Sequence, residues 1–473
     1  MKRKHLLLLF TTFFVFNFVF SQELTLRKGQ IIDSIAVKDS IQESFSLYLP
    51  TAFNTKEEWP VLFVFDEKGR GKQSLAMFRE VAESEHYILA ASNNISDTIT
   101  ISKNVLITGR MISKVNAILP LNKNRIYTAG VASGGRVANL MPIFFKDIEG
   151  VISCGASLAN VELLAAKNPF HFIGIVGKED FNYSSLLSDE KILNRLKFPN
   201  NLLVSNSTDK WPEKKLLKKG LRLFTLSAMA KGFVPKDTTY IENSYQEDLA
   251  FINELRKNKK MLLADRAFTE MLDVYRTHKN IDSLKNERKE LRKDKLYKNL
   301  KRNESAALFK EELLKEDYIY YLEEDLYAYN YNNLGWWNYQ MAEINKFISG
   351  DSEAERQMGK RLNSYLNALI EDNIEIVKSE KIVDEEALIL LSMLKTITEP
   401  KAYKYYLEVI SLSSKYEEYG TAIFYLEEAF KKGFKNKEKL DTLAHTALLR
   451  ISPEYNKLMD KYLESARYEI IDE

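Results

Sequence analysis

Short, continuous apolar runs alternate with amphipathic segments through the first half of this sequence. The runs that predict buried strands are Pro60–Asp66, Tyr87–Ala91, Arg125–Ala129, Gly150–Ser153 and Phe170–Val176. Lys72–Glu85 and Thr108–Leu119, which lie between them, have the spacing of helices. Strands that are apolar on both faces and alternate with helices predict a parallel sheet covered on both sides. Ile31–Ala36 and Ser44–Leu49 predict an antiparallel pair before it.

The segment GVASGGR, which begins at Gly130, follows one of these strands and precedes a helical pattern. A small-x-nucleophile-x-small pattern at such a turn is typical of a strained strand-to-helix turn that exposes a catalytic nucleophile. With Gly130 and Gly134 as the small residues, the central residue is Ala132, which has no oxygen to attack a carbonyl. In the other register Ser133 is central and Val131 takes a small position. A β-branched valine suits a tight turn poorly, so we prefer the register centred on Ala132.

The second half of the sequence has a different texture. From about Gln246 onward strand patterns are absent, and charged segments with helical spacing continue to the end. The chain has 473 residues, enough for two or three domains. We predict a sheet domain over residues 22–235 and a helical domain over residues 236–473, with the junction at Lys236–Tyr245.

Two segments of the helical half resemble tetratricopeptide-type repeats. In Asn333–Ala342 a Leu-Gly pair at Gly335 would let a neighbouring helix pack closely. The second segment is Gly420–Phe434. One face of its predicted helix carries Ala422, Leu426 and Ala429. The period is not regular, so we expect degenerate repeats, and an irregular helical bundle is the alternative.

Two other features of this half allow a structural and a functional interpretation. The basic run Lys285–Arg302 could contact nucleic acid, but its glutamates and helical phase favour a solvated helix face. The aromatic residues between Tyr318 and Tyr339 are compatible with a binding surface, and packing between helices is the favoured interpretation.

The amino terminus has the pattern of a secretory signal peptide. Basic residues at 2–4 precede the apolar run Leu6–Phe20, and Val19 and Ser21 fit the −3 and −1 positions of a cleavage site. We therefore predict a signal peptide over residues 1–21 and an exported protein, periplasmic or secreted. The run is short for a spanning helix and no second apolar span follows, so no transmembrane span is expected after cleavage. No cysteine lies near the junction, so a lipoprotein is not expected.

Charge and cysteine content exclude several functions. Lysine and arginine number 68 against 66 acids, and removal of the three basic signal residues leaves a net charge near −1. This balance favours neither nucleic acid nor an anionic membrane as a partner. Cys154 is the only cysteine and lies in an apolar run, which predicts a small buried side chain. The five histidines lack paired spacing, so we expect no metal site and no cofactor.

From Ser44 to Gly220 the chain resembles the α/β-hydrolase fold, in particular secreted esterases and dienelactone-hydrolase-like enzymes. The matching segments, in chain order, are Ser46–Pro50, Val64–Asp66 leading into Gly69–Gly71, Ala91–Asn94, Arg125–Tyr127, GVASGGR, Gly177–Tyr183 and Trp211-Pro212. The resemblance implies an α/β domain with a mostly parallel sheet, followed here by an all-α helical-repeat region. It also implies a serine, an acid and a histidine arriving in that chain order.

The resemblance places Ala132 at the serine, Asp180 at the acid and Asp209 at the histidine. The last assignment rests on Ser207–Pro212, which stands where these relatives have Gly-Gly-His-x-Trp-Pro. Both reactive members of the triad are therefore missing. Asp209 cannot replace an imidazole held by Asp180, because two adjacent carboxylates repel or share a proton. His86, which we expect to open a strand, does not fit the vacant position, and neither do His171, His278 and His445. His171 is expected to be buried and structural.

The turn centred on Ala132 could bind a ligand although it lacks a nucleophile. The N–H groups of Ser133 and Gly134 would lie at the positive end of a helix, which attracts anions and carbonyl oxygens. Asp66 and Gly69 belong to a loop that stands where the resemblance places the oxyanion-hole loop. We expect no intact catalytic site, and these four residues are the candidate ligand-binding residues.

Two functions remain open at this point. The first is a non-catalytic exported protein that binds a protein partner in the cell envelope through its helical domain. The alternative is a weak or unconventional serine hydrolase, esterase- or peptidase-like, in which Ser133 is activated by Asp180 or Asp209 through water. Loss of one triad member alone costs several orders of magnitude in rate, which favours the first. A glycan-binding module has no positive signal in the sequence beyond export.

Overall fold

The computed structural model describes residues 25–38, 40–205 and 212–465. The chain divides into two compact units, residues 1–127 and 128–473. The signal peptide predicted at residues 1–21 lies outside the described residues. The predicted boundary between residues 235 and 236 falls inside the second unit and stays a prediction.

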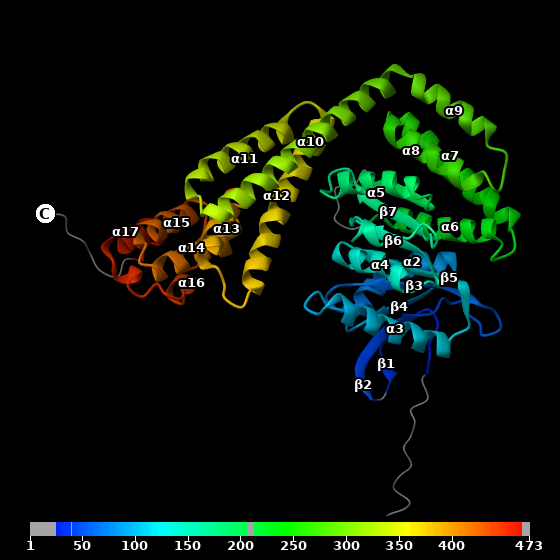
Figure 1. Ribbon diagram of the computed structural model, residues 1–473, viewed down its shortest axis with the longest axis horizontal. Coiled ribbons are helices and arrows are strands. Elements are labelled where there is room, and N and C mark those ends of the chain that lie inside the picture. Colours follow the sequence, from blue (N-terminus) through cyan, green and yellow to red (C-terminus); the bar gives the residue numbers. More distant parts are fainter. Residues whose placement is uncertain (1–24, 39, 206–211, 466–473) are drawn as a thin grey trace, which may run out of the picture. The chain divides into compact units, whose positions relative to one another are not determined.

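The first unit carries the beginning of the sheet (Figure 1). Its elements are β1 (Ile31–Lys38), β2 (Ile41–Tyr48), β3 (Trp59–Phe65), α2 (Gly71–Glu85), β4 (Ile88–Ser92), α3 (Ile101–Ile118) and most of β5 (Leu121–Val131). Strands β1 and β2 pair antiparallel, as predicted, and β2 also pairs antiparallel with β4. Strands β3 and β4 pair parallel, and all their residues are buried because both faces are apolar.

Two local predictions in the first unit need correction. Helix α3 begins at Ile101, well before the predicted Thr108, because the side chain of Thr100 accepts a hydrogen bond from the Lys103 N–H (3.3 Å) and caps the helix there. His86 does not open a strand. It ends α2 in the left-handed conformation, with φ of 60°.

The second unit begins with the end of β5 and continues to the carboxyl end of the chain. Its sheet elements and covering helices are α4 (Ser133–Phe144), β6 (Ile148–Cys154), β7 (His171–Gly177), α5 (Tyr183–Arg195), β8 (Asn200–Ser205) and α6 (Lys214–Lys231). Strands β6, β7 and β8 pair parallel. Helices alone follow among the described residues: α7 (Thr238–Lys257), α8 (Met261–Tyr275), α9 (Asp282–Lys293), α10 (Lys295–Ala328), α11 (Leu334–Ser349), α12 (Glu353–Ser379), α13 (Glu385–Thr398), α14 (Tyr403–Lys415), α15 (Tyr419–Lys431), α16 (Lys437–Asp441) and α17 (Pro453–Leu463).

The eight strands form one sheet in the order β1-β2-β4-β3-β5-β6-β7-β8. Apart from the β1 and β2 pairings at one edge, the strand pairs given above are parallel. The predicted fold class, a mostly parallel sheet domain followed by an all-α region, is therefore confirmed. No helix in the described part of the chain is long and apolar enough to cross a membrane.

The aromatic residues between Tyr318 and Tyr339, which were expected to pack between helices, lie partly in the core and partly at the surface. Tyr318 and Trp337 are buried in one helical core, and the Trp337 indole donates to Asp325 (2.7 Å), whose carboxylate also accepts from Asn333. Tyr327, by contrast, is 90% exposed. The packing interpretation is right for only part of the stretch.

The two segments with tetratricopeptide-like patterns behave differently. Ala422, Leu426 and Ala429 are buried on one face of α15, as predicted. The role predicted for Gly335 is wrong, because no atom outside its own helix neighbourhood lies within 4 Å of the place where a Cβ would stand. The repeat itself stays a prediction.

Candidate functional site

Ala132 is the strained residue of the turn between β5 and α4. Its φ of 52° and ψ of −125° lie in a region that side-chain-bearing residues rarely adopt, at a cost of about 1–3 kcal/mol. Its N–H donates to the oxygen of Cys154 at the end of β6 (2.8 Å), and the residue itself is exposed. The strained, accessible position of the turn thus carries a methyl group.

Two glycines, Gly130 and Gly135, allow the backbone of this turn to pack tightly. A Cβ on Gly130 would lie 2.2 Å from the oxygen of Gly134, which no side chain tolerates. A Cβ on Gly135 would lie 3.0 Å from the Cβ of Ala156, also tighter than ordinary contact. The glycines therefore let the first turn of α4 approach β5 and β6, and the tight geometry persists although its central residue cannot react.

Ser133 is not at the apex of the turn. It is the first residue of α4 and is half-buried. The N–H groups of Gly135 and Arg136 bond to the oxygen of Ala132 (2.9 and 3.2 Å). Those of Ser133 and Gly134 are the first of the helix and have no acceptor within it. The turn retains donors at a positive helix end, which suits a carbonyl oxygen or an anion.

Asp180 lies in the loop that follows β7. Burial raises the pKa of its carboxyl group, and a hydrogen bond from the Asn182 N–H (2.8 Å) opposes that shift. A Cβ on Gly155 would lie 3.0 Å from its Oδ2, and the preceding residue, Cys154, accepts the N–H of Ala132. The Asp180 loop and the Ala132 turn therefore both adjoin the carboxyl end of β6. Asp209, the third predicted position, lies outside the described residues.

The loop around Asp180 is held by helices α10 and α12. These contacts join Arg361 Nη1 to the Lys178 oxygen (2.6 Å), Lys360 to Glu179 (2.7 Å), and Lys315 to the Phe181 oxygen (3.3 Å) and Ser184 Oγ (2.9 Å). Residues before, within and after the loop are thus bound by cations of the helical region. The positive charge of Lys315 also lowers the Asp180 pKa, although burial outweighs it.

Arg361 is the buried centre of these contacts. Its guanidinium pairs with Glu311 Oε2 (2.6 Å), lies 5.3 Å from the centre of the Tyr183 ring, and is almost fully enclosed. Glu311 also pairs with Lys315 (2.8 Å) and has no exposed surface. Buried charges of this kind are stable only when paired, so the network fixes α10 and α12 against the loop.

The predicted ligand residues of the first unit are engaged within their own loop. Arg70 binds the Asp66 carboxylate at both oxygens (3.1 and 2.8 Å), and the Lys68 N–H donates to Oδ1 (2.8 Å). Burial alone would raise the Asp66 pKa, but these hydrogen bonds hold it below its usual value. Gly69 has φ of 62°, and a Cβ there would lie 2.5 Å from the Asn93 oxygen. A ligand role for Asp66 and Gly69 stays a prediction.

His171 and Cys154 are buried structural residues, as predicted. Burial lowers the pKa of His171 to about 4, and its Nε2 lies 2.7 Å from Asn201 Oδ1. Burial raises the pKa of the Cys154 thiol. The imidazole and the thiol are both enclosed within the sheet.

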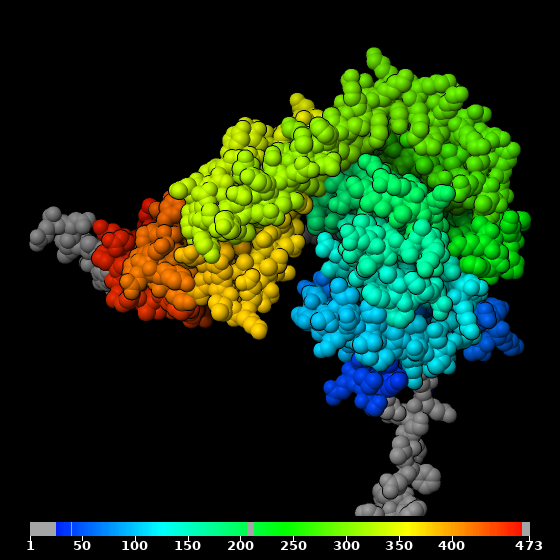
Figure 2. All heavy atoms as spheres, viewed as in Figure 1, coloured from blue at the N-terminus to red at the C-terminus, as the bar shows by residue number. Residues whose placement is uncertain are grey.

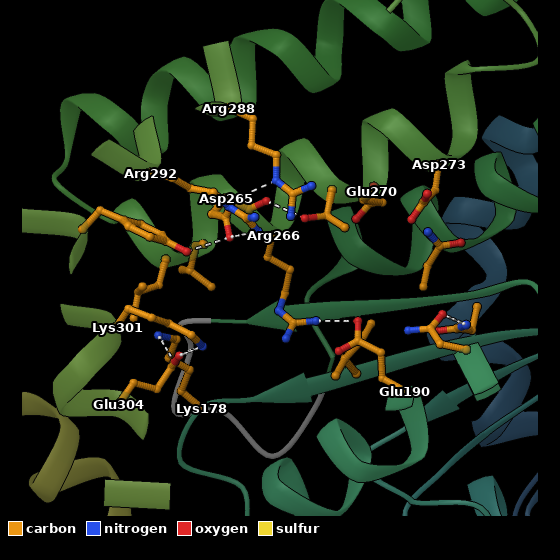
Figure 3. Close-up of a pocket in the computed structure, with 18 of the residues that line it drawn as sticks. Lys178, Glu190, Asp265, Arg266, Glu270, Asp273, Arg288, Arg292, Lys301 and Glu304 are labelled. Atoms are coloured by element: carbon orange, nitrogen blue, oxygen red, sulfur yellow. Dashed lines mark hydrogen bonds and ion pairs between the residues drawn. The ribbon is translucent and has the colours of Figure 1, made fainter. Parts of the chain in front are cut away.

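A charged pocket of about 330 Å³, which the sequence analysis missed, lies among α5, β8, α8, α9 and α10 (Figure 3). Arg288 and Arg292 point at Asp265 (2.9 and 2.7 Å), and Arg266 points at Glu190 (2.9 Å). Lys178 and Lys301 flank Glu304 (3.5 and 3.1 Å). These cations and acids neutralise one another, which makes the pocket an internal ion-pair network.

This network involves one inward-turned residue of the basic run. Lys285–Arg302 was expected to be a solvated helix face, and most of its residues are exposed, but Arg288 is largely enclosed and bonded to Asp265. Burial would raise the Asp265 pKa, and the hydrogen bonds of Arg292 and Arg288 outweigh it and lower the pKa. The one sequence signal for this pairing is the helical spacing of the run, because residues four apart, such as Arg288 and Arg292, share a helix face.

The fold and the turn define an α/β-hydrolase-type protein with an appended helical region. No family model matches the sequence, and no curated protein matches it. Among solved structures, Est1E from Butyrivibrio proteoclasticus is 12% identical, with 42% of this chain and 99% of that chain covered and a TM-score of 0.33. A dienelactone hydrolase from Anabaena variabilis is 14% identical, with 42% and 98% covered and a TM-score of 0.33.

A third similar structure is a putative dipeptidyl aminopeptidase IV from Bacteroides ovatus, 14% identical, with 41% of this chain covered and a TM-score of 0.33. The chain spans about a third of that protein's length, since the match covers 35% of it. Nothing about activity follows from likenesses this distant.

Proposed function

We propose that this protein is an exported, non-catalytic α/β-hydrolase-type protein that serves as a binding or scaffold component of the cell envelope. The observation that carries the proposal is the conformation of Ala132. Its φ of 52° identifies it as the residue that the turn presents, and its side chain has no nucleophilic atom.

The surroundings of Ser133 and Asp180 support the same conclusion. Ser133 is the first residue of α4 and not the strained residue of the turn. Asp180 belongs to a loop whose other residues are bound by Arg361, Lys360 and Lys315. A serine without an imidazole base is a weak nucleophile, and a carboxylate is a poor substitute for that base.

The helical region supports a binding role. Its helices form two hydrophobic cores of their own, one centred on Trp337 and one on Leu426. Stacked helices of this kind present extended surfaces to peptides and proteins. Large apolar side chains, including Tyr339 on α11 and Phe424 on α15, remain exposed there.

Ester turnover tests the absence of catalysis. Hydrolysis of a p-nitrophenyl ester is compared for the wild type, Ser133→Ala, and the restored variant Ala132→Ser/Asp209→His. We expect the wild type and Ser133→Ala to match the uncatalysed rate, and the restored variant to exceed it by about a hundredfold, the order of a positioned base. Wild-type turnover that Ser133→Ala abolishes would instead establish a serine hydrolase.

Site-specific crosslinking in the producing cell tests the binding role. A photoreactive residue replaces Tyr339 on α11, and the matched control replaces Leu106, which is similarly exposed on α3. We expect the α11 position to form a discrete adduct with one envelope protein, identified by mass spectrometry, and the α3 position to form none. Absence of an adduct from α11 would count against a partner on this face.

A further inference from the structure

Helix α10 has one face that is exposed along the length of the helix. Its inward side holds the buried residues Ala307, Glu311, Tyr318 and Leu322, which pack into the helical core or pair with Arg361. Residues a half-turn away form the outward side, because α10 is one unbroken helix from Lys295 to Ala328 (Figure 1). The helix lies at the molecular surface (Figure 2).

The outward face, here called the α10 stripe, has a heptad-like pattern. It consists of Lys295, Lys298, Arg302, Phe309, Leu313, Glu316, Tyr320, Glu324 and Tyr327, all of them exposed. Phe309 is 66% exposed, Tyr320 58% and Tyr327 90%, although these are large apolar side chains. Its apolar members Phe309, Leu313, Tyr320 and Tyr327 are four, seven and seven residues apart, which is the pattern of a helix that packs against another helix.

Charge is segregated along the same helix. The segment Lys295–Arg302 contains four basic residues and no acid, whereas Glu311–Asp325 contains seven acids and one lysine. Within the described residues, Lys298, Arg302 and Glu324 form no ion pair with any other side chain. One end of the stripe is therefore basic, its centre apolar and its other end acidic and aromatic.

We propose that the α10 stripe binds the α10 stripe of a second copy of this chain in antiparallel orientation. The two-fold axis crosses the outward face of α10 at the level of residue 311 along the helix. Phe309 of one copy then faces Leu313 of the other, and Lys298 faces Glu324. Arg302 faces the Tyr320 ring, which suits a cation–π contact. Each pairing occurs twice, as a two-fold interface requires.

A second copy fits this face because the stripe is complementary to itself only when reversed. Parallel pairing would oppose basic to basic and acidic to acidic ends, which is unfavourable. A helix of 34 residues is roughly 50 Å long at 1.5 Å per residue, long enough for several turns of contact. The proposal is independent of whether the protein is catalytic.

The test is sedimentation equilibrium of the purified protein and of charge-reversal variants. Lys298→Glu and Glu324→Lys each oppose like charges at two symmetric places, and Lys298→Glu/Glu324→Lys restores opposite charges. The matched control is Lys401→Glu/Glu380→Lys, which reverses exposed charges outside α10. All four side chains are exposed, so these changes leave folding intact, and circular dichroism verifies this.

We expect a reversible dimer whose dissociation constant rises about tenfold or more in each single reversal and returns to within about threefold of wild type in the double reversal. The control should match the wild type, and added salt should weaken the dimer. A protein that remains monomeric, a dimer indifferent to the single reversals, or a double reversal that does not restore pairing would overturn the proposal.

Discussion

The guanidinium of Arg361 donates to the main-chain oxygen of Lys178 at 2.6 Å, which ties helix α12 to the first residue after β7. Lys178 comes two residues before Asp180, where the sequence resemblance places the acid of a catalytic triad. Helix α12 is thus bonded to the loop that carries this candidate residue.

Replacing Arg361 with alanine should destabilise the protein strongly. The change leaves Glu311, which has no exposed surface, with Lys315 as its one remaining ionic partner among the described residues. We expect a loss of about 3 kcal/mol in the free energy of unfolding, measured with urea by tryptophan fluorescence. Arg356→Ala removes a similar pair with Glu353 at the surface and should cost less than about 1 kcal/mol. Equal effects of the two changes would contradict a central role for Arg361.

The Asp189 carboxyl group should make stability fall as the pH rises from 4 to 6. Burial raises its pKa from 3.8 to about 6, while its Oδ2 accepts the N–H of Leu158 (2.8 Å). The folded chain therefore binds more protons than the unfolded chain between these values, and stability is greatest below them. At about 1.36 kcal/mol per pKa unit, the charged group costs about 3 kcal/mol at neutral pH.

Asp189→Asn tests this dependence, since the amide keeps an acceptor for Leu158 without the charge. We expect the variant to be more stable than the wild type at pH 7 and to show a smaller decline in stability between pH 4 and 6. Asp317→Asn, a change at an exposed carboxylate, serves as the control and should keep the wild-type slope. An unchanged slope in Asp189→Asn would show that another group titrates.

Glycine at position 132 should stabilise the turn. Ala132 has φ of 52°, where glycine is unstrained, and the relief of about 1–3 kcal/mol exceeds the entropy cost of glycine of about 0.5–1 kcal/mol. We expect a net gain of about 1 kcal/mol by urea unfolding. Ala138→Gly, inside α4, relieves no strain and should cost about 1 kcal/mol. Destabilisation by both changes would mean that Ala132 is unstrained in solution.

Alanine at position 130 should have the opposite effect. Its Cβ would stand 2.2 Å from the Gly134 oxygen. Because that oxygen is a backbone atom, it cannot move aside as the end of a flexible side chain could. We expect a loss of about 3 kcal/mol or more in stability. Gly335→Ala is the contrast, because its Cβ meets open space at the start of α11, and it should gain about 0.5–1 kcal/mol. A Gly130→Ala protein as stable as wild type would disprove the tight turn.

Local sequence patterns were sufficient to predict seven of the eight strands of the sheet, and β8 (Asn200–Ser205) is the one that they missed. Continuous apolar runs marked the strands, and the paired glycines at Gly130 and Gly134 marked the turn at which Ala132 is strained. The start of α3 was misplaced because it depends on a cap, Thr100, and not on the apolar period. His86 was assigned to a strand because its left-handed conformation leaves no trace in hydropathy.

The contacts around Asp180 could not be predicted. Arg361 and Lys178 are 183 residues apart in the sequence, and no motif contains both of them. The ion pair between Arg288 and Asp265, which encloses Arg288, could not be predicted either. Such contacts depend on how the helices pack, and no residue spacing encodes them.

The reactivity of the purified protein toward a fluorophosphonate, read from its intact mass, tests the central claim most directly. The probe phosphonylates an activated serine, so a turn centred on Ala132 offers it no target. We expect no mass increase for the wild type or Ser133→Ala, and one adduct for Ala132→Ser/Asp209→His. A wild-type adduct that maps to Ser133 and disappears in Ser133→Ala would show a working serine nucleophile and contradict this account.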